Sequence, residues 1–167
     1  MPVGFASAFV RRVLRFGGRL SGRERASFTR LRARAGDVRT TYLARPVGKG
    51  NVATLEYVSL VQQEPIRVEA TSRAKSPSPL PRSRSQGGYF EPAIDPSTKR
   101  PMDTDAEYKA LSALAQRLDA TATWQTMGVV YLFTERQPCA SCASVIAQFE
   151  ERFPLVSIVV AFDHPFP

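Results

Sequence analysis

Histidine and cysteine are scarce in this chain. Among its 167 residues there are one histidine, His164, and two cysteines, Cys139 and Cys142. A secreted domain stabilised by disulfides would show more cysteines at wider spacing. A single histidine excludes most catalytic schemes that pair histidine with serine or cysteine, and most metal sites built from several histidines. The two cysteines, three positions apart, therefore indicate metal-binding or redox chemistry.

Long apolar runs are missing as well. The longest ones are about the length of a strand and fall well short of the ~20 residues that a membrane-spanning helix needs, so we expect no transmembrane segment. The length of the chain leaves room for one domain, since domains cluster at roughly 100–150 residues.

Acidic residues are nearly absent from the first fifty positions. There Glu24 and Asp37 stand against 12 Lys and Arg, a balance of +10, whereas residues 51–167 hold 11 Lys and Arg against 13 acids, a balance of −2. Such a basic block can attract nucleic acid or an anionic membrane surface. The alternatives are a solvated arm without a specific partner, a linker, or an Arg-rich organellar transit peptide.

Apolar patterns divide the chain into elements. Residues 1–39 predict one or two basic helices, and residues 76–86, rich in Ser, Pro and Arg, predict a loop. Helical spacing predicts helices over residues 105–118 and 139–153. Apolar runs predict four strands, over residues 51–61, 66–71, 127–133 and 155–162. Trp124 and Tyr131 are predicted to lie in the core or at its edge.

The order of these elements indicates the fold class. It reads strand, strand, helix, strand, helix, strand, and the closing strand-helix-strand unit favours parallel pairing. We therefore predict an α/β fold with a single central mixed sheet flanked by helices. The chain divides into a basic helical extension or linker, residues 1–39, and a folded domain, residues 40–167.

Two short motifs begin the two predicted helices. Asp105-Ala106-Glu107 starts the first helix, and Pro-Cys-Ala-Ser-Cys at 138–142 starts the second. Cysteines at i and i+3 share one helix face and can bind one ion, and a helix N-terminus favours the thiolate that binds metal. Two thiolates leave a tetrahedral zinc short of one protein ligand and a water. The start of the other helix can supply that ligand and, two residues later, a carboxylate that moves protons.

This arrangement resembles the signature of the cytidine-deaminase-like superfamily, H-x-E followed by P-C-x-x-C, with Asp-Ala-Glu where His-Ala-Glu is usual. Two longer segments, residues 104–118 and 131–154, resemble the toxin-deaminase families of bacterial polymorphic toxins. The resemblance implies a zinc-dependent deaminase domain over residues 40–167 with an α/β/α fold, which converts cytosine to uracil in nucleic acid. It also implies an effector, secreted or injected, that acts in the cytoplasm of a target cell and is paired with an immunity protein. Organelle targeting through the Arg-rich N-terminus is the alternative.

The residues take roles under this hypothesis. Cys139, Cys142 and Asp105 are the zinc ligands, and Glu107 is the catalytic acid/base. Asp105 replaces the usual histidine, and the more negative ligand set makes the metal's water less acidic. No substrate-binding residue is assigned, although Glu135 and Arg136 lie just before the cysteines and are candidates.

Structural alternatives exist for each motif. Thr104 and Glu107 also fit a capping box, S/T-x-x-E, at the start of an apolar helix. Asp105 also fits a charge placed to interact with the helix dipole. The cysteines also fit a thioredoxin-like redox pair. His164 is interpreted as a polar residue near the terminus rather than a ligand.

Two other functions compete with the deamination of nucleic acid. One is a deaminase of free nucleosides or bases, and the other is a nucleic-acid-binding module that zinc merely stabilises. The sequence leaves DNA, RNA, single strands and duplexes open as partners. Single strands are favoured because extruding a base from a duplex costs a few kcal/mol, and single-stranded DNA is the substrate that we expect.

Overall fold

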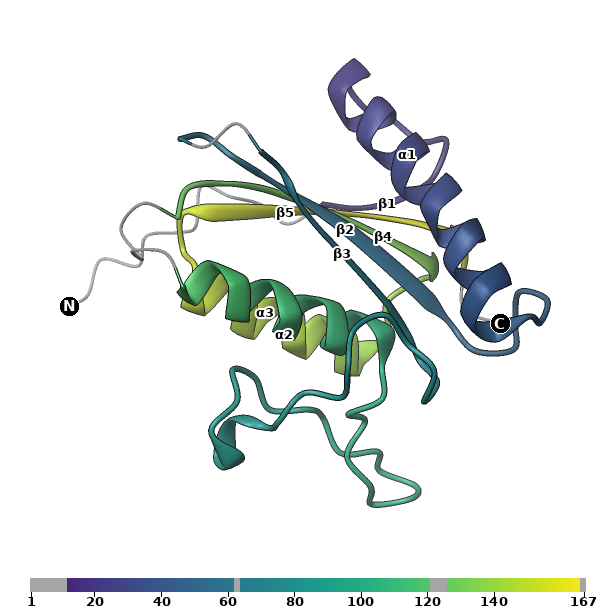
Figure 1. The fold of residues 1–167 in the computed structure, drawn as a ribbon, viewed down its shortest axis with the longest axis vertical. Helices are drawn as coiled ribbons and strands as arrows, with labels where there is room; N and C mark the ends of the chain where they lie inside the picture. The colour runs from purple at the N-terminus through teal and green to yellow at the C-terminus, as the bar shows by residue number, and fades with distance from the viewer. Residues whose placement is uncertain (1–11, 62–63, 121–125, 166–167) are drawn as a thin grey trace.

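Five strands form one mixed sheet in a computed structural model that describes residues 12–61, 64–120 and 126–165 (Figure 1). The strands are β1 (Arg12–Arg15), β2 (Val52–Ser59), β3 (Ile66–Thr71), β4 (Gly128–Arg136) and β5 (Val156–His164). Their spatial order is β1-β5-β4-β2-β3; β1, β5 and β4 are parallel, whereas β2 is antiparallel to both β4 and β3. The predicted mixed sheet is confirmed, and so is the parallel pairing of the last two strands.

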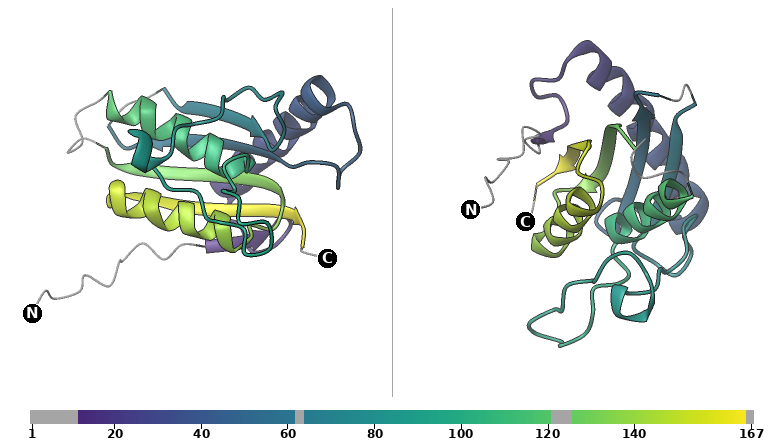
Figure 2. Two further views of the ribbon diagram at one scale, coloured as in Figure 1. Left: turned by 90° about the horizontal axis from the view of Figure 1, so that it is seen from below. Right: turned by 90° about the vertical axis from the view of Figure 1, so that its left-hand side faces the viewer.

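Helices cover both faces of the sheet. They are α1 (Gly22–Val38), α2 (Ala106–Asp119) and α3 (Ala140–Arg152). Helices α2 and α3 lie side by side on one face, and α1 lies alone on the other (Figures 1 and 2). The predicted α/β class with flanking helices is therefore confirmed, with small shifts at the ends of individual elements. Within the described residues, no helix has the length and apolar character of a membrane span.

The larger core lies between the sheet and the pair α2–α3. Alternate strand residues face it, because successive side chains in a strand point to opposite faces. Its strand members include Leu55, Tyr57, Val130, Leu132, Ile158 and Val160, and its helix members include Leu111, Leu114, Ile146 and Phe149. This core fixes α2 and α3 against each other, which brings their N-termini to the same end of the sheet.

A second core lies under α1. The helix contributes Phe28, Leu31, Ala35 and Val38, and the sheet contributes Val52, Tyr131, Phe133, Val159 and Ala161. A capping box begins the helix, because the Ser21 hydroxyl accepts from the Glu24 amide while the Glu24 carboxylate accepts from the Ser21 amide. Although α1 is rich in arginine, one of its faces is apolar and packs against the sheet.

The prediction of helix is wrong for residues 12–15. They form β1, which pairs with β5 and so satisfies backbone groups that would otherwise be exposed at the sheet edge. Gly17, at φ 95°, then turns the chain towards α1, where the predicted helix is confirmed. Residues 1–11 of the basic segment, and Trp124, lie outside the described residues. The domain boundary between residues 39 and 40 stays a prediction.

Candidate metal centre

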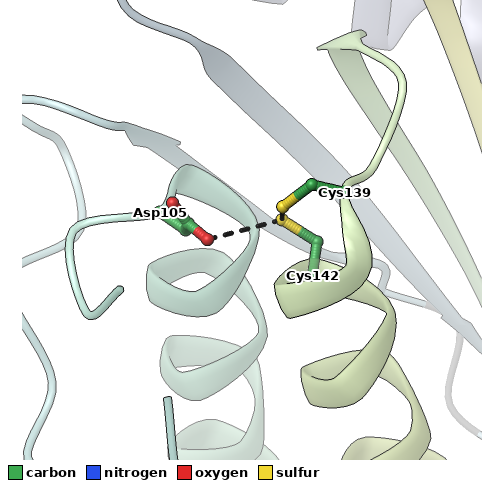
Figure 3. Close-up of side chains that lie close together, drawn as sticks. All are labelled: Asp105, Cys139 and Cys142. Carbon is green, nitrogen blue, oxygen red and sulfur yellow. Dashed lines mark hydrogen bonds between the residues drawn. The ribbon is translucent and has the colours of Figure 1, made fainter. Parts of the chain in front are cut away.

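The N-termini of α2 and α3 carry the candidate ligands. Asp105 is the N-cap residue of α2 and Cys139 is that of α3, yet neither side chain caps its own helix. Both instead point into the space between the two helix ends, where Cys142 joins them from the first turn of α3 (Figure 3). The structure thus brings together the three residues that the sequence motifs predict as ligands.

The distances within this cluster suit a small tetrahedral ion. The Sγ atoms of Cys139 and Cys142 are 3.5 Å apart, and Cys142 Sγ lies 3.6 Å from Asp105 Oδ2. All three ligand atoms lie within 4.8 Å of one another. Zinc bonds of about 2.3 Å to sulfur and about 2.0–2.2 Å to oxygen, at tetrahedral angles, would separate the donors by roughly 3.6–3.8 Å. The donor set therefore fits zinc in both chemistry and spacing.

Acidic groups are crowded in this cluster. A hydrogen bond from the Cys142 thiol lowers the pKa of Cys139 to about 5, and the same bond, together with burial, raises the pKa of Cys142. Burial also raises the pKa values of Asp105 and Glu107. Within the described residues, no Lys or Arg forms an ion pair with any of these four groups. A cation bound between them would relieve this crowding of negative charge.

Ser141 lies between the two cysteines in sequence and supports the cluster. Its hydroxyl donates to Asp105 Oδ2 over 2.8 Å and lies 2.8 Å from Cys139 Sγ. The residue is buried, so this contact is shielded from bulk water. Ser141 thereby holds the Asp105 carboxylate beside the sulfurs.

Glu107 lies beside the cluster in the first turn of α2, with 3% of its surface exposed. Its Oε1 accepts from Thr134 Oγ1 over 2.6 Å and from Asn51 Nδ2 over 3.1 Å. Its Oε2 lies 3.4 Å from the Cys142 Sγ. One carboxylate oxygen is thus fixed by the sheet, and the other faces the candidate ligands.

The capping-box alternative for Glu107 is wrong. The N-cap of α2 is Asp105 rather than Thr104, and no side chain caps the helix. The buried contacts with Thr134 and Asn51 position the Glu107 carboxylate instead. His164, an exposed residue at the end of β5, is outside the ligand cluster found in the described residues.

Sequence reasoning missed Asn51 and Thr134. Asn51 directly precedes β2, and its Nδ2 also donates to Thr134 Oγ1 over 2.9 Å. Its Oδ1 accepts from the amide of Arg136. The only available signal was Thr134, a polar residue directly after the apolar run of residues 127–133. Asn51 gave no signal, because its contacts depend on the pairing of β2 with β4.

The cluster opens into a cavity of about 320 Å³. Asp105, Glu107 and both cysteines line it, and so do Asn51 and two arginines, Arg73 and Arg136. Its size is at the lower end of the ~300–1,000 Å³ typical of small-molecule sites. Glu135, a predicted candidate for substrate contact, is buried and bound to Arg39, away from this cavity.

The mixed sheet, its flanking helices and the Asp/Cys/Cys cluster together define a cytidine deaminase-like α/β fold. Residues 95–164 match the model of a toxin-deaminase family, described as the BURPS668_1122 family of deaminases. The matched region contains Asp105, Glu107, Cys139 and Cys142, and it indicates a deaminase. The resemblance to toxin deaminases that the sequence motifs predict is therefore confirmed. No curated protein matches the chain.

Proposed function

We propose that the chain is a zinc-dependent hydrolase that deaminates cytosine to uracil in nucleic acid, as the toxin domain of a polymorphic toxin. The observation that carries this proposal is the placement of Glu107 Oε2 beside the cluster of Asp105, Cys139 and Cys142. The match to a toxin-deaminase family supports the toxin role. An immunity protein in the producing cell is a consequence of that role.

Asp105, Cys139 and Cys142 would hold the zinc, which when bound supplies a water activated as nucleophile. Glu107 takes up a proton from the attacking water at Oε2 and delivers it to the departing amino group, and the second proton of the water ends on N3 of the ring. The carbon–nitrogen bond at C4 of cytosine breaks, a carbon–oxygen bond forms there, and ammonia leaves, so the reaction needs no redox partner. Thr134 and Asn51 hold Oε1 and thus keep Oε2 directed at the cavity.

Two of the alternatives, the zinc-stabilised binding module and the redox pair, are less well supported. A zinc-stabilised binding module would gain nothing from a buried carboxylate without a cationic partner beside its metal ligands. A thioredoxin-like pair would have no use for Asp105 3.6 Å from Cys142 Sγ. A deaminase of free nucleosides shares the whole site with the proposed enzyme, so only the substrate distinguishes the two.

The test is the sequencing of DNA and RNA from cells that express the chain, combined with ammonia release from cytosine-containing DNA, RNA and cytidine. We expect C-to-T changes in DNA, concentrated in single-stranded regions, and none with the matched variant Glu107→Gln. If the base changes are confined to RNA, the substrate is RNA and not DNA. A zinc-loaded protein that releases no ammonia from any of the three would refute the proposal.

A further inference from the structure

A second cavity, of about 350 Å³, adjoins the candidate metal centre. Arg73 lines both cavities. Lys49 lines the second cavity, and its two neighbours in sequence, Gly48 and Gly50, line the first. Among the described residues, those that line the second cavity include four cationic residues and no acidic one. These four are Arg45, Lys49, Arg73 and Lys75, and Tyr42 and Leu43 add an apolar wall.

The cationic side chains of this cavity are available to a ligand. Arg45, Lys49, Arg73 and Lys75 are all exposed. None of them forms an ion pair with another described residue. Their charges therefore add to one another at one position on the surface, next to the cavity that contains Glu107.

Arg45 and Lys49 lie in one loop, which is fixed by hydrogen bonds to its backbone carbonyl groups. The buried Arg39 side chain donates to the carbonyl oxygens of Arg45, Pro46, Lys49 and Gly50. Positive φ angles at Gly48 and Gly50, 104° and 85°, allow the tight path between these contacts. These contacts use the backbone carbonyls of Arg45 and Lys49 and not their side chains, so replacing the two side chains leaves these hydrogen bonds intact.

The basic residues of α1 are used differently. Three of its arginines form ion pairs with acids of the sheet, Arg30 with Glu56, Arg32 with Asp163 and Arg34 with Glu69. Part of the positive charge of α1 is thus neutralised within the fold. The cationic cavity, rather than α1, offers unneutralised charge beside the candidate catalytic residue.

We propose that this cationic cavity holds the nucleotide next to the deaminated one in a nucleic-acid strand. Arg45, Lys49, Arg73 and Lys75 contact the flanking phosphates, and the flanking base stacks on Tyr42, a contact that tolerates any base. This inference rests on the proposed function and narrows it, because a free nucleoside has no flanking phosphate. The cavity therefore directs the enzyme to polynucleotides.

The experiment measures binding of a fluorescent single-stranded heptadeoxynucleotide with a central uracil, which cannot be deaminated. We expect the triple variant Arg45→Gln/Lys49→Gln/Lys75→Gln to raise the Kd at least tenfold. Its salt dependence should flatten by about 2 in log–log slope, since each phosphate contact adds ~0.7 on single strands. Tyr42→Leu should weaken binding severalfold at an unchanged slope, because stacking involves no charge.

The matched control, Arg19→Gln/Arg23→Gln/Arg25→Gln, removes the same charge from exposed positions around the start of α1. It should bind as the unaltered protein does. Equal losses in both triple variants would show that net charge alone governs binding and would overturn the proposal. Displacement of the oligonucleotide by poly-glutamate of equal charge and concentration would also overturn it, since the cavity would then accept an acidic protein.

A second arm separates this proposal from the proposed function. The same oligonucleotide with a central cytosine is tested for ammonia release, and the cavity variant should raise KM at least tenfold while kcat is retained. If the unaltered protein deaminates no cytosine, the proposed function fails, yet the uracil oligonucleotide still decides whether the cavity binds a strand. If the triple variant of Arg45, Lys49 and Lys75 keeps the KM and Kd of the unaltered protein, the proposed role of the cavity is refuted and the proposed function stands.

Discussion

Two buried glutamates at the same end of the sheet have opposite surroundings. Glu135 is 6% exposed, and both of its carboxylate oxygens accept from the guanidinium of Arg39, at 2.6 and 2.8 Å. Glu107 is 3% exposed, and its partners are a hydroxyl, an amide and a thiol. The neighbouring β4 residues Thr134 and Glu135 face opposite sides of the sheet, which separates the two environments.

This difference shows how the molecule uses buried charge. A carboxylate with a guanidinium partner is neutralised and contributes to structure, whereas burial without a cation raises the pKa of Glu107 and favours uptake of a proton. Buried groups of the second kind are concentrated at functional sites. The charged groups of the α1 face thus attach a helix and a loop, whereas Asp105 and Glu107 on the α2–α3 face have no cationic partner among the described residues, as the proposed metal binding and proton transfer require.

The largest effect should come from replacing the two glutamates separately. Glu107→Ala should reduce deamination by ~10²–10⁴-fold, the usual contribution of a general acid or base, while zinc content is retained. Glu135→Gln should instead lower the free energy of unfolding and preserve the turnover of the folded protein. Ammonia release, metal analysis and denaturant unfolding measure these three properties. Comparable losses of turnover in both variants would remove the distinction between the two glutamates.

Removal of Arg39 should produce the largest loss of stability. Arg39→Met leaves Glu135 buried without a counter-charge, and breaking a buried pair in this way typically costs about 3–5 kcal/mol. The double variant Arg39→Met/Glu135→Gln should recover part of that loss. Urea unfolding of the three proteins gives the comparison. A cost of about 1 kcal/mol or less for Arg39→Met, as for an exposed pair, would contradict the structural role of this ion pair.

Thr134 should have a smaller effect, confined to the rate. Thr134→Val keeps the shape of the side chain but removes the hydroxyl that donates to Glu107 Oε1. A hydrogen bond to a charged group contributes about 1.5–3 kcal/mol, so kcat should fall tenfold or more at an unchanged KM. Thr134→Ser should restore most of the rate, as expected of a residue that positions Glu107. If Thr134→Ser is as slow as Thr134→Val, the hydroxyl has no such role.

The smallest effect should come from the pair of Arg34 and Glu69 on the α1 face. Arg34 Nε and Glu69 Oε1 lie 2.5 Å apart, but the Arg34 side chain is 57% exposed. Solvent screening limits the contribution of such exposed pairs to about 0–1 kcal/mol. We therefore expect Arg34→Gln to lower the free energy of unfolding by no more than about 1 kcal/mol. The same unfolding assay as for Arg39→Met tests this prediction. A loss as large as that of Arg39→Met would mean that burial does not set the strength of these ion pairs.

The parts of the fold that the sequence predicts are those with a local signal. Apolar periodicity identified α2, α3 and four strands, and the spacing of Cys139, Cys142 and Asp105 at two helix starts identified the cluster. The short basic strand β1 has no such pattern, since only its pairing with β5 makes it a strand. The contact of Arg39 with Glu135 spans 96 positions. Such contacts arise from the packing of the elements, which no local pattern encodes.

X-ray absorption at the zinc edge is the most direct test of the candidate centre. The zinc-loaded chain should show two sulfur ligands at about 2.3 Å and two oxygen or nitrogen ligands at about 2.0–2.2 Å, with one zinc per chain. In Asp105→Ala, most of the zinc should be lost, and Asp105→His should retain it with two sulfurs. A spectrum with four sulfurs, or Asp105→Ala with full zinc and an unaltered spectrum, would contradict the Asp/Cys/Cys site.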